Sequence, residues 1–123
     1  MNKNPKTNRI FIVLGMHKSG TTLISKLLND SGISMGNFDY HKDYDKGNHF
    51  ERIETQSINK SLLNCHNQSS LSATKVIRLN DISKDHILMG KNIVDSISCE
   101  HLSWGFKDPR TCLTYDFWNA VLP

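Results

Sequence analysis

The sequence has no long hydrophobic run and no dense cluster of charge of one sign. Its longest apolar stretch, residues 10–14, has five residues. That is well short of the roughly 20 needed by a membrane-spanning helix and of the about 7–15 in a signal-peptide core. The 15 Lys and Arg residues are scattered among 12 Asp and Glu residues, with no basic run of the kind that binds nucleic acid. We therefore expect no membrane span and no nucleic-acid partner, and we predict a cytoplasmic protein.

Cysteine is also scarce. The three cysteines, Cys65, Cys99 and Cys112, are odd in number and far apart. In a chain without an export signal this favours free thiols over a disulfide framework, and we expect each thiol to be buried in packing. The six histidines show no zinc-type spacing, so we predict no metal site.

The composition that remains is that of an ordinary globular domain. The chain has 123 residues, of which 37% are hydrophobic and 22% charged, and its net charge of +3 suits an anionic ligand. Residues 1–8 are polar and are predicted to form a flexible tail. Residues 9–123 are predicted to form a single α/β domain.

The apolar pattern predicts strands alternating with helices. Residues 10–14 are uninterrupted in their apolar character, as in a central strand of a parallel sheet, and residues 104–106 predict a second strand parallel to it. After Thr21, four apolar residues share one helical face: Leu23, Ile24, Leu27 and Leu28. Gly32 stands where a left-handed C-terminal cap of this helix is expected.

The rest of the chain gives weaker patterns. Residues 37–48 predict a polar surface loop, and residues 76–79 a short strand. Three further helices are expected from apolar spacing, and their marker residues are Phe50, Ile53, Ser57 and Leu62 for the first, Ile82, His86, Met89, Ile93 and Ile97 for the second, and Leu113 and Phe117 for the last. The second of these stripes and both tryptophans, Trp104 and Trp118, are expected in the core.

The stretch "IFIVLGMHKSGTTLISKLL" predicts a phosphate-binding loop between a strand and a helix. Gly15 and Gly20 let the backbone turn so that several N–H groups face one anion at the positive end of the helix. Thr21 and Thr22 add hydroxyl donors. Lys18 lies inside the turn, whereas the standard nucleotide-triphosphatase motif has its lysine directly after the second glycine.

This loop, "GMHKSGTTLISKLL", resembles the phosphosulfate-binding loop of the sulfotransferases. Two later stretches, "KGNHFERIETQSINKSLL" and "WGFKDPRTCLTYDFW", are similar to segments of bacterial sulfotransferase-like proteins in the same order. The resemblance implies a P-loop NTPase-like parallel sheet with flanking helices. It also implies that 3′-phosphoadenosine 5′-phosphosulfate is the co-substrate and that no magnesium is needed. The donor-binding positions that we expect are Gly15, His17, Lys18, Ser19, Gly20, Thr21, Thr22 and Arg110.

Sulfuryl transfer needs a base near the acceptor and positive charge near the leaving phosphate. Glu51 is the first candidate for the base, although a carboxylate at a helix start is equally explained by the helix dipole. His49 is the second candidate, with a surface histidine as the more ordinary interpretation. Lys107 would assist Lys18 at the sulfuryl group. Asp108 would either pair with Arg110 or cap the last helix.

In sulfotransferases a later strand and helix bind the 3′-phosphate, and no matching stretch occurs before Pro123. We therefore expect a truncated, N-terminal portion of a sulfotransferase-like protein, with little transfer on its own and a tendency to self-associate. The expected acceptor is a small molecule or carbohydrate with a hydroxyl or amine. The alternatives are a P-loop nucleotide kinase or other phosphotransferase, and a non-catalytic fragment that binds an anion.

Overall fold

The computed structural model describes residues 6–16, 18–36, 51–68 and 75–123. Two strands, β1 (Arg9–Val13) and β2 (Ser103–Lys107), pair in parallel with Arg9 opposite Ser103 and Val13 opposite Lys107. Both predicted strands and their parallel pairing are confirmed. On the other edge of β2, Ser34 forms an isolated parallel bridge with Trp104, so β2 is flanked on both sides.

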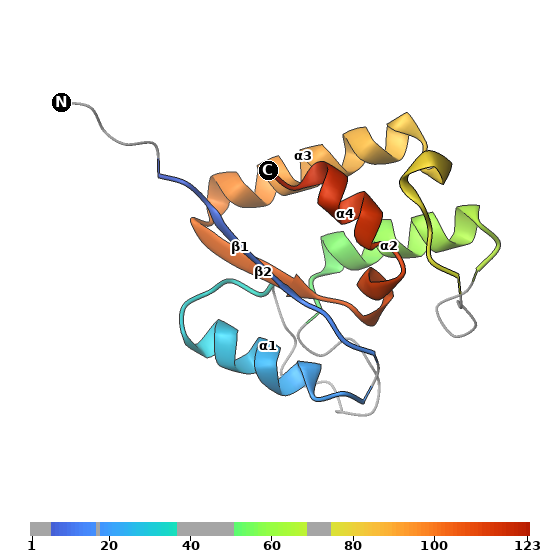
Figure 1. Cartoon of the computed structure of the whole chain (residues 1–123). Helices are drawn as coiled ribbons and strands as arrows, with labels where there is room; N and C mark the ends of the chain where they lie inside the picture. The colour runs from blue at the N-terminus through green and yellow to red at the C-terminus, as the bar shows by residue number, and fades with distance from the viewer. Residues whose placement is uncertain (1–5, 17, 37–50, 69–74) are drawn as a thin grey trace.

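Helices cover the two faces of this small sheet unequally. The helix α1 (Thr21–Asp30) lies on one face, while α2 (Ile53–Cys65), α3 (Lys84–Glu100) and α4 (Tyr115–Val121) lie on the other (Figure 1). Short 3₁₀ turns, η2 (Leu79–Asp81) and η3 (Pro109–Cys112), precede α3 and α4. The chain is therefore an α/β protein with a two-stranded parallel sheet and flanking helices.

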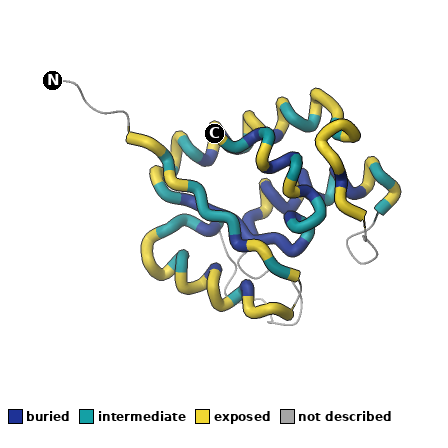
Figure 2. Tube along the Cα trace, in the orientation of Figure 1, coloured by how far each residue is buried: buried dark blue, intermediate teal, exposed yellow. Residues whose placement is uncertain are grey.

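The large aromatic side chains lie on the face that α2, α3 and α4 cover. Trp104, Phe106, Phe117 and Trp118 are fully buried. Figure 2 shows that the buried segments, in dark blue, gather at the centre of the fold. The ring centroids of Phe106 and Trp118 lie 4.6 Å apart, and those of Phe117 and Trp118 lie 5.0 Å apart in an edge-to-face arrangement. The core role predicted for both tryptophans is confirmed.

The predicted core stripe of α3 is confirmed at Ile97, which is buried, and at Ile93, which packs against the core. Ile82 packs against the same core but precedes the helix. Met89, by contrast, is exposed. The left-handed Gly32 is confirmed by its φ of 91°.

The helix α1 begins and ends as predicted, but its apolar stripe does not face the sheet. Leu23, Ile24 and Leu27 are about half exposed or more, and the buried residues of this helix are Thr21 and Ser25. Apolar spacing identified the helix. It did not identify the side that meets the sheet, because small polar residues at positions four apart make that contact.

Three other predictions are wrong. Residues 76–79 form no strand, because Ile77 makes a single backbone hydrogen bond to Leu113 and the chain then enters η2. In α2, Ile53 and Ser57 are exposed while Leu62 is buried, so the proposed face does not exist; Phe50 lies outside the described residues. Cys65 and Cys99 are exposed free thiols, and Cys112 is half buried, so burial was wrongly expected for all three.

Two further observations concern the predicted tail and membrane character. Asn8, at the end of the predicted tail, is anchored by its side-chain amide, which donates to the carbonyls of Ser98 and His101 at 2.9 Å. Residues 1–5 and the polar loop predicted over 37–48 lie outside the described residues. No helix within the described ranges combines the length and the apolar character needed to cross a membrane.

Candidate functional site: an oxyanion loop beside a buried ion-pair cluster

The described part of the loop between β1 and α1 contains two residues in the left-handed backbone region. Lys18 and Gly20 have positive φ values of 62° and 82°, and Lys18 is one of the few non-glycine residues in this left-handed region. A Cβ on Gly15 would lie 2.5 Å from Thr21 Cγ2 and 2.7 Å from Ser19 Oγ. A side chain at position 15 would therefore require the Thr21 and Ser19 side chains to move.

The amino end of α1 has no side-chain cap. Gly20 is its N-cap residue and has no side chain to accept from the first-turn N–H groups, whereas Ser83 Oγ accepts from the backbone of His86 at the start of α3. Ser19 Oγ, the nearest hydroxyl, instead donates to the carbonyl of Met16. Among the described residues no side chain caps the first-turn N–H groups of α1, so these groups are available to an anion.

Lys107 ends β2 at the same edge of the sheet where β1 enters the loop. Its Nζ lies 3.0 Å from Glu51 Oε1 and 3.5 Å from Thr22 Oγ1, so it bridges a carboxylate and the start of α1. Both ends of the ion pair are buried, with Lys107 5% and Glu51 7% exposed. A buried pair of this kind is stable only while both partners stay in place.

Both carboxylate oxygens of Glu51 contact neighbouring side chains. Its second oxygen, Oε2, accepts from Gln56 Nε2 at 2.8 Å and lies 3.9 Å from Arg110 Nη1. The residue precedes Arg52, the N-cap of α2, so it does not belong to the first turn of that helix. The interpretation of Glu51 as a helix-dipole carboxylate is therefore replaced by that of an anchor for Lys107.

Asp108 pairs with Arg110, which is one of the two roles that the sequence left open; the other role is wrong, because Asp108 caps η3 while the N-cap of the last helix, α4, is Thr114. Asp108 Oδ1 accepts from the backbone N–H of Arg110 at 3.0 Å and from Arg110 Nη1 at 2.8 Å. Arg110 is therefore held against two carboxylates, those of Asp108 and Glu51. Arg110 Nε is buried and has no acceptor in the described residues.

A buried amide beneath this cluster escaped the sequence interpretation. Asn59 donates from Nδ2 to Asp108 Oδ2 and Thr111 Oγ1, both at 3.1 Å. Its Oδ1 accepts from Thr114 Oγ1 at 2.7 Å and from Trp118 Nε1 at 2.9 Å. All four hydrogen bonds of the amide are thus made, which joins α2 to η3 and α4. Nothing in apolar spacing marks a buried asparagine.

The pKa of Asp108 is raised by burial, the dominant effect. The hydrogen bond from Asn59 and the positive charge of Arg110 oppose that rise. Asp108 is fully buried, so its carboxylate belongs to the support of the site and is not open to a ligand.

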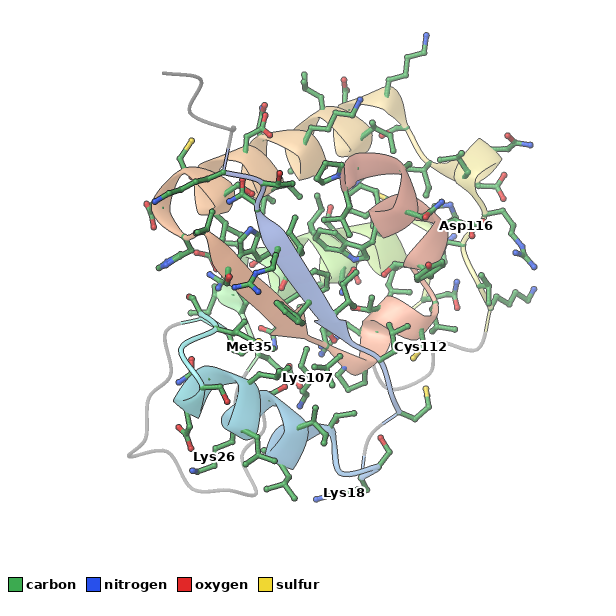
Figure 3. The ribbon with its side chains drawn as sticks, turned by 60° about the vertical axis from the view of Figure 1, so that its left-hand side comes forward. Lys18, Lys26, Met35, Lys107, Cys112 and Asp116 are labelled. Carbon is green, nitrogen blue, oxygen red and sulfur yellow. The ribbon has the colours of Figure 1, made fainter. Side chains whose placement is uncertain are left out.

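The structure brings together four of the residue positions predicted for the site and leaves others apart. Thr22, Lys107, Glu51 and Arg110 form one cluster at the carboxyl edge of the sheet. Lys18 is exposed at the tip of the loop, away from Lys107 (Figure 3). His17 and His49 lie outside the described residues.

Comparison with known protein families, with curated proteins and with solved structures finds no match to this chain. Among the described residues, no three His, Cys, Asp or Glu side chains gather as a metal-binding group.

Proposed function

We propose that this chain is a sulfotransferase-like protein with a P-loop NTPase-like fold. In this proposal the loop over residues 15–22 binds the 5′-phosphosulfate of 3′-phosphoadenosine 5′-phosphosulfate. The observation that carries the proposal is the start of α1, which has no side-chain cap among the described residues, follows a turn in which a Cβ at Gly15 would meet Thr21 and Ser19, and is flanked by Lys107 from the neighbouring strand. Such a site offers backbone N–H groups and positive charge to a single oxyanion.

When bound, the co-substrate supplies an activated sulfuryl group for a hydroxyl or amine acceptor, with carbohydrates among the candidates. The first-turn N–H groups and the Thr21 and Thr22 hydroxyls would hold its phosphate. Lys107, fixed at the start of α1, supplies charge from the sheet side. Lys18, exposed on the loop, supplies a second, mobile charge.

The surroundings of Glu51 favour a positioning role for this residue over the role of general base. A base must be within hydrogen-bond reach of the acceptor proton, yet Glu51 is buried with both oxygens already engaged by Lys107 and Gln56. We propose that Glu51 holds Lys107 against Thr22 and that His49 is the remaining candidate base.

A non-catalytic anion-binding role is the second candidate function. It is favoured by the mutual neutralisation of the buried charges, because Lys107 and Arg110 are both paired with carboxylates in the described structure. Arrangements of this kind stabilise a loop whether or not a group is transferred. The nucleotide kinase alternative depends on the same loop. It is disfavoured because Thr21 stands where the kinase motif has its lysine.

The test is a thermal-shift comparison of adenosine 3′,5′-bisphosphate, ATP with magnesium, and inorganic phosphate, followed by a transfer assay with labelled donor and a panel of sugars. Selective stabilisation by the bisphosphate together with labelled product supports sulfotransfer. Stabilisation by phosphate alone, without transfer, supports the non-catalytic role. Preference for ATP with magnesium overturns both in favour of a kinase.

The Glu51→Gln variant separates its two roles. A positioning residue acts through Lys107, so the variant should weaken bisphosphate binding while keeping the pH profile of any transfer. Loss of one limb of that pH profile, with unchanged bisphosphate affinity, would assign Glu51 as the base.

A further inference from the structure

A second candidate site surrounds Arg52, toward the amino end of β2 and independent of the oxyanion loop. Arg52 is 4% exposed and is fixed on three sides. Its Nε donates to the carbonyl of Gly105 at 3.1 Å, and its Nη2 donates to Ser34 O at 2.7 Å and Ser34 Oγ at 3.0 Å. Its guanidinium carbon lies 5.5 Å from the centroid of the Trp104 ring.

This buried cation forms no ion pair within 4.0 Å among the described residues, and the carboxylates of Glu54 and Glu100 act on it at longer range. Every acceptor that it meets is a carbonyl or a hydroxyl, and no ion pair joins it to Asp or Glu within 4.0 Å. Its Nη1 makes no hydrogen bond in the described structure and is not one of the solvent-inaccessible orphan atoms. The guanidinium therefore keeps one free donor for a ligand, and a buried cation with no carboxylate in direct contact is stabilised further when an anion joins it.

A cavity of about 250 Å³ adjoins this side chain, between the start of α2 and one face of α3. Ile93 and Ile97 give it an apolar wall, and the exposed carboxylates of Glu54 and Glu100 line its rim beside Asn92 and Ser96. The lining thus combines one cation, two carboxylates and a hydrocarbon surface.

The mixture of charges selects the ligand class. A simple anion would satisfy Arg52 but would meet two carboxylates, and a simple amine would satisfy the carboxylates but leave Arg52 Nη1 unpaired. A molecule with both charges and a short hydrocarbon chain satisfies every part of the lining. We propose that this cavity is a binding site for a small aliphatic amino acid, whose carboxylate pairs with Arg52 and whose ammonium pairs with Glu54 or Glu100.

Three matched probes test whether the cavity requires both charges of its ligand. L-Norleucine carries both charges, hexanoate is the same chain without the ammonium, and pentylamine is the same chain without the carboxylate. Titration of the isotope-labelled full chain, followed by amide chemical shifts of residues 92–100, should show L-norleucine binding about tenfold or more tightly than either analogue. Absence of shifts on α3 up to about 10 mM L-norleucine, well above a millimolar Kd, overturns the proposal.

Charge-removing variants at the rim test the assignment without touching the buried arginine. Glu54→Gln and Glu100→Gln should weaken L-norleucine and pentylamine while leaving hexanoate unchanged or tighter, because a repulsive carboxylate is lost. Asp95→Asn, an exposed position on α3 outside the cavity lining, is the matched control and should change nothing. Equal affinity for hexanoate and L-norleucine in the unmodified chain overturns the amino-acid assignment in favour of an anion site.

The Arg52→Lys variant completes the test. Lysine keeps the charge but lacks the guanidinium edge, so L-norleucine and hexanoate should both weaken while pentylamine is retained. Because Arg52 also ties Ser34 to Gly105, circular dichroism must first show that the variant is folded. Retained L-norleucine affinity in a folded Arg52→Lys chain contradicts the proposal, and if the variant unfolds, the glutamate variants decide it.

Discussion

The two faces of the sheet are built on different principles. On one face, Trp104 and Phe106 of β2 meet Phe117 and Trp118 of α4 in a fully buried aromatic core. On the other face, α1 is the one helix among the described residues; its buried residues are Thr21 and Ser25, and it exposes Leu23 and Leu27. The comparison indicates that the first face supplies most of the stability, while the second carries the loop that we propose to bind an anion, where tight packing is not required.

The largest expected effect concerns the aromatic face. Phe106→Ala should lower the free energy of unfolding by about 3–5 kcal/mol, because a fully buried ring is lost and leaves a cavity. Leu23→Ala, on the exposed side of α1, should change it by no more than about 0.5 kcal/mol. Urea unfolding followed by tryptophan fluorescence measures both variants.

A comparable loss in Leu23→Ala would contradict the comparison of the two faces. It would show that the outer face of α1 is covered in solution, and sedimentation at several protein concentrations would then identify self-association as the cause.

The next effect concerns the polar support of the aromatic face. Asn59→Ala should cost about 2–3 kcal/mol of unfolding free energy, since it leaves buried donors and acceptors without partners. Asn64→Ala, at an exposed position of the same helix, is the control and should have little effect. Equal costs for the two variants would mean that the Asn59 amide does not act as the link between α2 and α4.

The loop on the α1 face should respond in binding and not in stability. Lys18→Ala should weaken adenosine 3′,5′-bisphosphate by about 1.5–3 kcal/mol, roughly 10- to 100-fold, because a charge-assisted contact is lost. The melting temperature of the Lys18→Ala variant without ligand should not fall, because Lys18 is exposed. Lys91→Ala on α3 is the control in calorimetry, and equal affinities for the two variants would remove Lys18 from the site.

The Ser25→Ala variant is expected to raise the free energy of unfolding slightly, in contrast to the destabilising variants above. The Ser25 hydroxyl is buried without a hydrogen-bond partner in the described structure, so Ser25→Ala should stabilise the fold by up to about 1 kcal/mol. Thr55 is also buried, but its hydroxyl donates to Arg52 O at 3.0 Å, so Thr55→Ala should destabilise. Destabilisation by Ser25→Ala would show that its hydroxyl has a partner in solution.

The smallest expected effect is a change of the free energy of unfolding with pH, caused by Asp108. Burial raises the pKa of Asp108 above its ordinary 3.8, so the folded chain holds a proton that the unfolded chain has released. The contribution to stability is therefore full below pH 3.8 and is lost as the pH rises through the raised pKa. Asp108→Asn should remove this part of the slope, and superimposable pH profiles for the two proteins would contradict the raised pKa.

Sequence spacing predicted the parts of the fold in which backbone and side-chain preferences agree. The apolar run in β1, the glycine turn after it and the long helix α3 each have a local physical signature, and each was found. The parallel pairing of β1 with β2 followed from their connection through helices.

The remainder depends on contacts that a single sequence does not encode locally. Which side of α1 meets the sheet is decided by packing, and Thr21 and Ser25 occupy that side against the apolar pattern. At the site, the glycines and Lys107 were predictable from their positions after strands. The buried roles of Asn59 and Arg52 were not, because a polar residue in a helix or loop gives no sign of burial until its partners are placed.

The position of β2 between β1 and Ser34 also delays strand pairing during synthesis. Both of its neighbours are made early in synthesis, yet neither pairs with the other, and β2 follows β1 by roughly ninety residues. At about 5–20 residues per second on the ribosome, the apolar β1 strand therefore waits on the order of 5–20 s for its partner. During that interval its backbone is open to any other extended chain, so a nascent-chain chaperone should protect this protein most before residue 107 emerges.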